Sequence, residues 1–272
     1  MTWHEASALL AVSVMVAAGL FAPSPPRPAN QHGAFAFPDS EGKRLLVVSE
    51  PAQPALFHTA LCDGGRRSAV EFSHHQPTRE GNNGRQWAGN FDQLSGDVFN
   101  VRSAVAVTGG VCFLVGDAFL SAAATLAVES QPGPIECDAS MSARAGASRG
   151  RDVAHCWQVS RLPGERSLLL VQFARQGTDA LGSLVLADRT RMIFADWPAK
   201  DDGAGKDVWR VGDGGRLDPS DFTVPFLLQQ GDSYSLAVEW AREEGVSLSL
   251  FVSNGEDRFT KVVADYWYRA PL

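Results

Sequence analysis

The stretch "SYSLAVEWAREEGVSLSLFVSNGEDRFTKVVADYWY", residues 233–268, decides the fold class. Apolar residues alternate with polar or small ones over 235–240 and again over 246–252. A period of two is the mark of a strand with one buried face. The connections are short, and the second contains Asn254 followed by glycine, a pair that favours tight turns. With a third strand over 258–268, the segment predicts a three-stranded antiparallel meander.

Further strands are expected upstream of the meander. The runs 166–174, 181–187 and 191–197 form a second group joined by short turns, and no amphipathic helix long enough for a parallel crossover separates them. Shorter apolar runs, bounded by Gly, Pro, Asn and Asp, predict strands near 44–50, 55–61, 67–74, 98–107 and 111–115. The chain is therefore expected to be all-β, either as an antiparallel β-sandwich or as two small β units with meander connections.

The segment 117–130 fits two structures. Asp117 can serve as an N-cap for a helix with one apolar face, which predicts a possible short helix near 117–127, yet "TLAVE" alone reads as a strand. The Pro- and Gly-rich stretch 131–150 is expected to be a loop or linker. These boundaries give a β domain or first half of a sandwich over 41–130, and an antiparallel β domain over 151–272.

The N-terminal segment 1–22 has the composition of a signal peptide. Its run "ALLAVSVMVAAGLFA" is uncharged and shorter than the roughly 20 apolar residues of a spanning helix. The residues before that run, "MTWHE", lack the Lys or Arg of most leaders. A Pro-rich linker, 23–40, follows, without regular structure until about Arg44. We expect an exported protein, periplasmic or secreted, that does not span a membrane after leader removal.

The charge balance argues against nucleic acid as a partner. The 272 residues contain 24 Lys and Arg against 31 Asp and Glu, for a net charge of −7. Phosphate backbones are held mostly by basic side chains, which here are scattered and outnumbered. The expected partner is instead an unknown protein, a glycan or a component of the cell envelope.

The four cysteines, Cys62, Cys112, Cys137 and Cys156, predict two disulfides. Their number is even, and no C-x-x-C pair of the kind that holds zinc is present. Exported proteins meet an oxidising environment in which disulfides persist. Three pairings are possible, and the one with the shortest loops joins Cys62 to Cys112 and Cys137 to Cys156. In a protein that is not exported, the alternative is four buried free thiols.

Several motifs match catalytic or metal-binding patterns weakly. "GASRG", 146–150, fits the G-x-S-x-G pattern around Ser148, but a nucleophile elbow needs a strand before the serine and a helix after it. "EFSHH", 71–75, would place Glu71, Ser73 and His75 on one strand face, where solvated side chains are the simpler interpretation. The acidic loops 200–207 and 212–221 lack EF-hand spacing. No cofactor, metal or catalytic residue is predicted from these motifs.

The candidate binding loop surrounds "GNNG", 81–84. It comprises Asn82, Asn83, Arg85 and Trp87, a polar segment with an aromatic side chain of the kind that often displays a binding site. Trp87, Trp197 and Trp209 are candidate sugar-stacking residues, with core packing as the alternative for each.

Two functional hypotheses follow. The first is a periplasmic or secreted β-rich protein that acts as a binding or envelope-associated module through loops at one end of its sheets. The second is a secreted hydrolase whose site forms only in three dimensions, from His74, His75 or His155 with an Asp. Convergent catalytic geometry leaves no trace in a single sequence.

Overall fold

The computed structural model describes residues 32–49, 51, 53–103, 106–107, 110–201 and 206–270. The expected signal peptide, 1–22, and the first part of the expected linker lie outside this description. None of the helices in the described part of the chain has the length and apolar character needed to cross a membrane.

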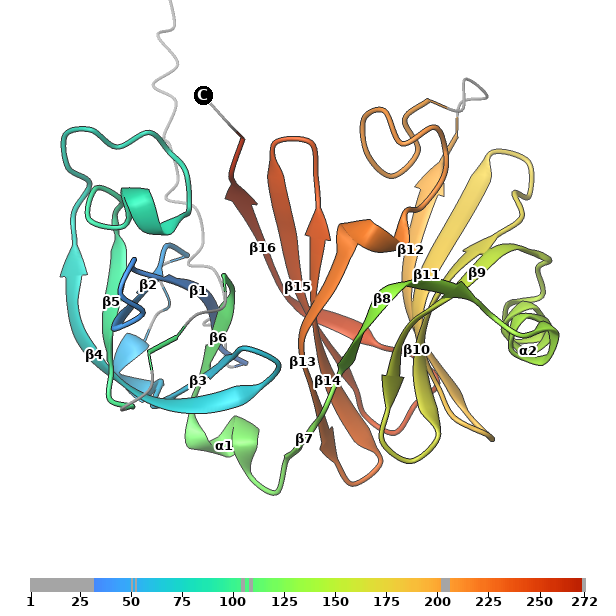
Figure 1. Cartoon of the computed structure of the whole chain (residues 1–272), viewed down its shortest axis with the longest axis horizontal. Coiled ribbons are helices and arrows are strands. Elements are labelled where there is room, and N and C mark those ends of the chain that lie inside the picture. Colours follow the sequence, from blue (N-terminus) through green and yellow to red (C-terminus); the bar gives the residue numbers. More distant parts are fainter. Residues whose placement is uncertain are drawn as a thin grey trace, which may run out of the picture.

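The fold is all-β, as the sequence predicts, and consists of a closed barrel and two five-stranded sheets (Figure 1). The barrel has the strand order β1-β2-β5-β4-β3-β6, and every pair is antiparallel. Its strands are β1 (Ala34–Pro38), β2 (Arg44–Val47), β3 (Thr59–Cys62), β4 (Arg66–Gln76), β5 (Gly96–Val101) and β6 (Cys112–Val115).

The two sheets form the rest of the molecule. The middle sheet has the order β16-β15-β14-β13-β7, and the outer sheet has the order β12-β11-β10-β9-β8. The middle strands are β7 (Ala124–Leu126), β13 (Phe222–Gln230), β14 (Ser233–Ala241), β15 (Gly245–Ser253) and β16 (Thr260–Tyr268). The outer strands are β8 (Glu129–Glu136), β9 (Val153–Leu162), β10 (Arg166–Phe173), β11 (Asp179–Ala187) and β12 (Met192–Lys200). The predicted meander is thus β14, β15 and β16, with β13 added at its edge.

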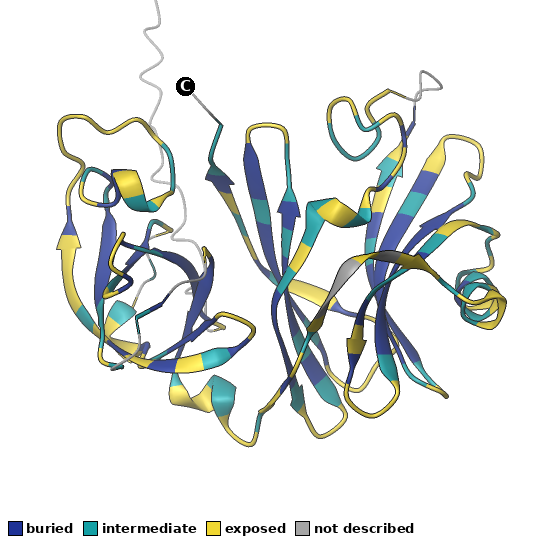
Figure 2. Ribbon diagram, in the orientation of Figure 1, coloured by how far each residue is buried: buried dark blue, intermediate teal, exposed yellow. Residues whose placement is uncertain are grey.

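The middle sheet is buried on both faces, which makes the molecule three layers deep. One face packs with the outer sheet around residues such as Trp197, Leu236 and Trp240. The opposite face packs with the outside of the barrel, where Phe37 meets Trp267 with ring centroids 5.6 Å apart. Figure 2 shows the buried residues along the strands of all three layers. The barrel and the sandwich therefore share one apolar interface.

The prediction of a linker over 23–40 is wrong for the part that the structure describes, because residues 34–38 form β1. The alternation of this strand is visible in "AFAFP": Ala34 and Ala36 fill the narrow barrel interior, whereas Phe35 and Phe37 pack toward the middle sheet. The abundant Pro and Ala around this run hid a period of two.

The prediction of a loop over 131–150 is also wrong, because this segment contains the end of β8 and the helix α2 (Ala139–Arg149). Asp138 is the N-cap and accepts a hydrogen bond from the backbone N–H of Met141 at 2.7 Å. Gly150 ends the helix in the left-handed conformation at φ 60°. Only Ala145 of this helix is buried, so its apolar pattern was too weak to signal a helix, and α2 covers the outer sheet from outside.

The segment 117–130 contains both the short helix and the strand that the sequence allows. Residues Asp117–Leu120 form one helical turn, α1, and β7 follows after a short connection. β7 then pairs with β13, where Leu126 lies opposite Leu227. This strand carries the chain from the barrel into the middle sheet.

Two disulfides are present, Cys62–Cys112 and Cys137–Cys156, and these are the pairs that the shortest loops predict. The first joins the neighbouring barrel strands β3 and β6 and is fully buried. The second ties the segment before α2 to β9. Bonds of this kind persist in oxidising compartments, so they agree with a protein that functions outside the cytoplasm.

Candidate binding groove

The loop between β4 and β5 is folded around the buried side chain of Asn90. Its Nδ2 donates to Asn82 Oδ1 and to the carbonyl oxygen of Arg85, both at 3.0 Å. Asn82 Oδ1 also accepts from the backbone of Gly84 at 2.8 Å, and Asn83 Oδ1 accepts from that of Arg85 at 3.1 Å. Two of the four predicted binding residues, Asn82 and Asn83, therefore use their amide oxygens to shape the loop.

The other two predicted residues, Arg85 and Trp87, differ in their burial. Arg85 Nε and Nη2 are buried and have no hydrogen-bond partner among the described residues. Trp87 is 48% exposed, and a Cβ placed on Gly89 would lie only 2.7 Å from its ring. The indole is thus held against the glycine while about half of its surface faces solvent.

The loop is tied to the last strand of the middle sheet. The backbone N–H of Gln86 donates to the carbonyl oxygen of Tyr268 at 3.1 Å, and the N–H of Tyr268 donates to Gln86 Oε1 at 2.6 Å. These bonds place Trp87 beside the end of β16, although about 180 residues of sequence lie between them.

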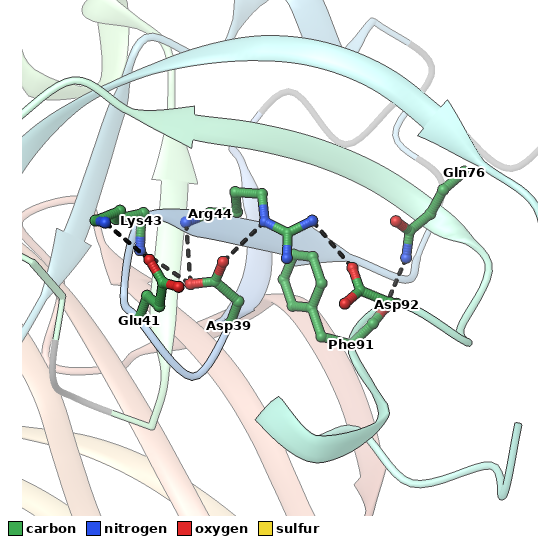
Figure 3. A network of polar contacts seen from close by, with 7 residues as sticks. All are labelled: Asp39, Glu41, Lys43, Arg44, Gln76, Phe91 and Asp92. Carbon is green, nitrogen blue, oxygen red and sulfur yellow. Dashed lines mark hydrogen bonds and ion pairs between the residues drawn. The ribbon is translucent and has the colours of Figure 1, made fainter. Parts of the chain in front are cut away.

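A polar network fixes the other side of this region (Figure 3). Arg44 donates from Nε to Asp39 Oδ2 at 2.8 Å and from Nη1 to Asp92 Oδ1 at 3.0 Å, while its guanidinium lies 4.7 Å from the ring centroid of Phe91. Burial opposes ionisation of Asp39, but Arg44 and two backbone N–H groups outweigh it and lower the pKa of this carboxyl. The network joins the β1–β2 turn to the loop that carries Trp87.

These elements enclose a groove of about 540 Å³, here named the Trp87 groove. Its polar and aromatic lining comes from the β1–β2 turn, the β4–β5 loop and the end of β16, and Val107 is among its apolar residues. The charged, amide and indole side chains of its lining are those of Asp39, Glu41, Gln86, Trp87 and Arg269.

Arg269 connects the Trp87 groove to a second hollow. Its Nη1 lies 3.3 Å from Glu239 Oε1 on β14, and Glu239 lines a groove of about 550 Å³ between the barrel and the two sheets, here named the junction groove. Gly110 lines both grooves. Burial raises the pKa of Glu239, and the charge of Arg269 offsets only part of this effect.

A β-bulge shapes the wall of the junction groove. Thr223 lies opposite Glu239 and Phe226 opposite Ala237, so Val224 and Pro225 together face a single residue of β14. Proline has no N–H to give to a ladder, which makes a bulge one of the few places in a sheet that accept it. Val224 and Pro225 line the same groove as the partly buried Glu239.

The remaining sequence candidates for catalysis lie apart from these grooves. Ser148 is in the last turn of α2, where its Oγ donates to the carbonyl oxygen of Arg144 at 2.9 Å, so it is not on a nucleophile elbow. His155 stacks on Trp157 with ring centroids 5.3 Å apart, and its neighbour Cys156 is in a disulfide.

His75 does meet acidic and hydroxyl groups. Its Nδ1 lies 2.9 Å from Asp97 Oδ1, and its Nε2 lies 3.4 Å from Ser95 Oγ. Glu71, which the sequence predicts on the same strand face, instead binds the guanidinium of Arg102, with Nε at 2.8 Å. Within the described residues, no three His, Cys, Asp or Glu side chains gather in a way that could hold a metal ion.

The acidic loop 212–221 uses its carboxylates to hold backbone. Asp213 accepts from the N–H groups of Val208, Trp209, Arg210 and Gly215 at 2.7–3.1 Å. Burial opposes ionisation of Asp213, but these four donors outweigh it and lower its pKa. The carboxylate of Asp213 therefore serves to form turns, while residues 202–205 of the other acidic loop lie outside the described residues.

Among the three candidate tryptophans, only Trp87 is exposed. Trp197 is buried between the sheets, and Trp209 packs at the edge of the same cluster and donates from Nε1 to the carbonyl oxygen of Trp197 at 2.9 Å.

The sequence reasoning missed Asp39, Glu41, Glu239 and Arg269. These residues come from distant segments and meet only through the packing of the barrel on the middle sheet, so no local motif marks them. No family model, no curated protein and no solved structure matches the chain.

Proposed function

We propose that the protein is an exported binding module that holds a neutral oligosaccharide in the Trp87 groove. The observation that carries this proposal is the half-exposed indole of Trp87, which packs against Gly89 at the wall of a groove with polar side chains around it. Tryptophan is enriched at recognition surfaces, where its large ring packs on a ligand and its N–H reaches a polar partner.

The chemistry of the lining favours a sugar. An indole face suits the apolar C–H surface of a pyranose ring, while carboxylate, amide and guanidinium groups suit its hydroxyls. Gln86 and Glu41 supply such groups at the groove. The charged groups of the lining are each paired with an opposite charge: Asp39 with Arg44, Glu41 with Lys43 and Arg269 with Glu239. Because these charges are compensated within the protein, the groove favours neutral over anionic sugars.

Export is part of the same proposal. The apolar leader expected over 1–22 and the two disulfides together support a periplasmic or secreted location. Neutral polysaccharides and envelope glycans are encountered in that setting. A protein partner that docks on Trp87 is the competing outcome.

The test is binding of the full mature chain to an array of neutral and acidic oligosaccharides, followed by titration of the best neutral ligand. We expect Trp87→Ala to weaken binding about fivefold or more, on the analogy of a nucleic-acid base, whose stacking on an aromatic side chain contributes on the order of 1–3 kcal/mol. Tyr266→Ala is the matched control, since Tyr266 is 47% exposed and does not line the groove. Absence of any glycan ligand, or equal binding by both variants, would reject the proposal.

A further inference from the structure

Ser95, His75 and Asp97 form a serine–histidine–aspartate arrangement at one end of the barrel. Ser95 Oγ lies 3.4 Å from His75 Nε2, and His75 Nδ1 lies 2.9 Å from Asp97 Oδ1. The hydroxyl and the carboxylate thus contact opposite nitrogens of one imidazole. This is the order of contacts by which a histidine takes a proton from a nucleophile while an acid orients it, and the first contact is commonly loose without substrate.

A β-bulge in β4 is responsible for the alignment. Phe72 lies opposite Phe99, but His74 lies opposite Val98, so Ser73 is the extra residue. Without this insertion His74 would face Asp97; with it, His75 does. Bulges that redirect a side chain in this way are common next to active sites.

The carboxylate of Asp97 is buried, whereas the imidazole of His75 is open to solvent. Asp97 continues the inward-facing row of Phe99 on β5, and its side chain is only 7% exposed, whereas that of His75 is 47% exposed. A buried carboxylate that orients a reachable imidazole fits catalysis at the mouth of a barrel, a place where sites often form.

The segment that carries Ser95 is held in place from both sides. Gln76, the residue after His75, is buried and donates from Nε2 to the carbonyl oxygens of Phe91 at 2.6 Å and Leu94 at 2.8 Å. After Ser95, Gly96 has φ +156°, and a Cβ there would lie 2.4 Å from the carbonyl oxygen of Val47. Ser95 therefore lies between a segment bound by a buried glutamine and a glycine that closely approaches the backbone of β2.

We propose that Ser95 is a nucleophile, with His75 as its general base and Asp97 as the orienting acid, and that the site cleaves esters. This activity is independent of the Trp87 groove. With Nδ1–H donated to Asp97, His75 Nε2 accepts the Ser95 proton as Oγ bonds to the acyl carbon. The ester C–O bond then breaks, and the leaving alkoxide takes that proton. Water repeats the sequence, which releases the carboxylic acid and regenerates the Ser95 hydroxyl.

The experiment uses the full mature chain and a fluorophosphonate probe, with which Ser95 Oγ would form a P–O bond as fluoride leaves and His75 takes the proton. We expect the adduct on the peptide that contains Ser95, identified by mass spectrometry. Ser95→Ala should abolish it. His75→Ala should slow labelling by about a hundredfold or more, the usual contribution of a general base. Hydrolysis of p-nitrophenyl esters should fall in parallel.

Matched variants separate the site from background reactivity. His74→Ala removes the neighbouring histidine, and Ser148→Ala removes a serine whose Oγ is bound to a helix carbonyl; both should label as the unaltered protein does. Absence of an adduct on Ser95, or labelling that is equally fast after His75→Ala in a variant with an unchanged far-ultraviolet spectrum, would overturn the proposal.

Discussion

At the scale of single residues, Glu239 is a carboxyl whose ionisation opposes the fold. Burial raises its pKa above the ordinary value of 4.5, so the folded protein binds this proton more tightly than the unfolded chain does. The protonated Glu239 therefore contributes to the free energy of unfolding at low pH. This contribution is lost as pH rises from about 4.5 through the raised pKa that Glu239 has in the folded protein.

Glu239→Gln tests this directly, because the amide does not titrate. We expect the free energy of unfolding of the unaltered protein, relative to the variant, to increase as pH falls through that window. Urea titrations of both proteins at several pH values between 4 and 8 measure the difference. A difference that stays constant across this range would show that Glu239 is not perturbed by its burial.

Gly96 follows Ser95 and lies close to the backbone of β2. Gly96→Ala would force a Cβ against the carbonyl oxygen of Val47 and strain a positive φ. Gly84→Ala is the control, because Gly84 has φ +77° and nothing lies within 4 Å of its Cβ position. We expect Gly84→Ala to lower the free energy of unfolding by about 1 kcal/mol, and Gly96→Ala to lower it by at least about 1 kcal/mol more. Urea unfolding of both variants measures these values. Equal costs would contradict the close approach.

At the scale of elements, the segments with a clear period of two were predictable and those with mixed composition were not. Residues 233–268 predict β14 to β16 because apolar residues alternate with polar or small ones in the sequence, although the folded sheet is buried on both faces. β1 alternates too, but Pro and Ala around it resemble a linker. α2 buries a single alanine, so its caps, Asp138 and Gly150, are the only local signals for it.

The disulfide next to α2 should stabilise its attachment to the outer sheet. Replacing Cys137 and Cys156 by alanine opens a loop with a sequence separation of 19, which corresponds to about 3 kcal/mol in the loop-entropy model. The pair Cys62 and Cys112, with a separation of 50, corresponds to about 4 kcal/mol, and its burial adds a cavity cost. In urea unfolding, the variant that lacks Cys62 and Cys112 should lose more free energy of unfolding than the variant that lacks Cys137 and Cys156. The reverse order would contradict this prediction.

At the scale of the whole molecule, the candidate groove could be predicted only in part. The polar loop with Trp87 was visible in the sequence as a Gly-Asn turn beside an aromatic residue. Its opposite wall was not, because Arg269 and Asp39 reach it only after the barrel packs on the middle sheet. Contacts between segments more than 150 residues apart carry no periodic signal.

The same interface predicts one cooperative unfolding transition. Phe37 and Trp267 belong to a buried cluster that spans the barrel and the middle sheet, so neither unit can unfold without exposing the other. Tryptophan fluorescence and far-ultraviolet circular dichroism should give coincident urea transitions. Two separated transitions would show that the barrel and the sandwich are independent.

The central claim, that Trp87 is the contact point for a neutral sugar, is tested most directly by fluorine NMR of protein labelled with 5-fluorotryptophan. The Trp87 signal is assigned from its loss in Trp87→Phe, and neutral oligosaccharides that score on the array are then titrated. We predict that the Trp87 signal shifts on addition of sugar while that of the buried Trp197 stays in place. A Trp87 signal that does not move at saturating sugar would contradict the claim.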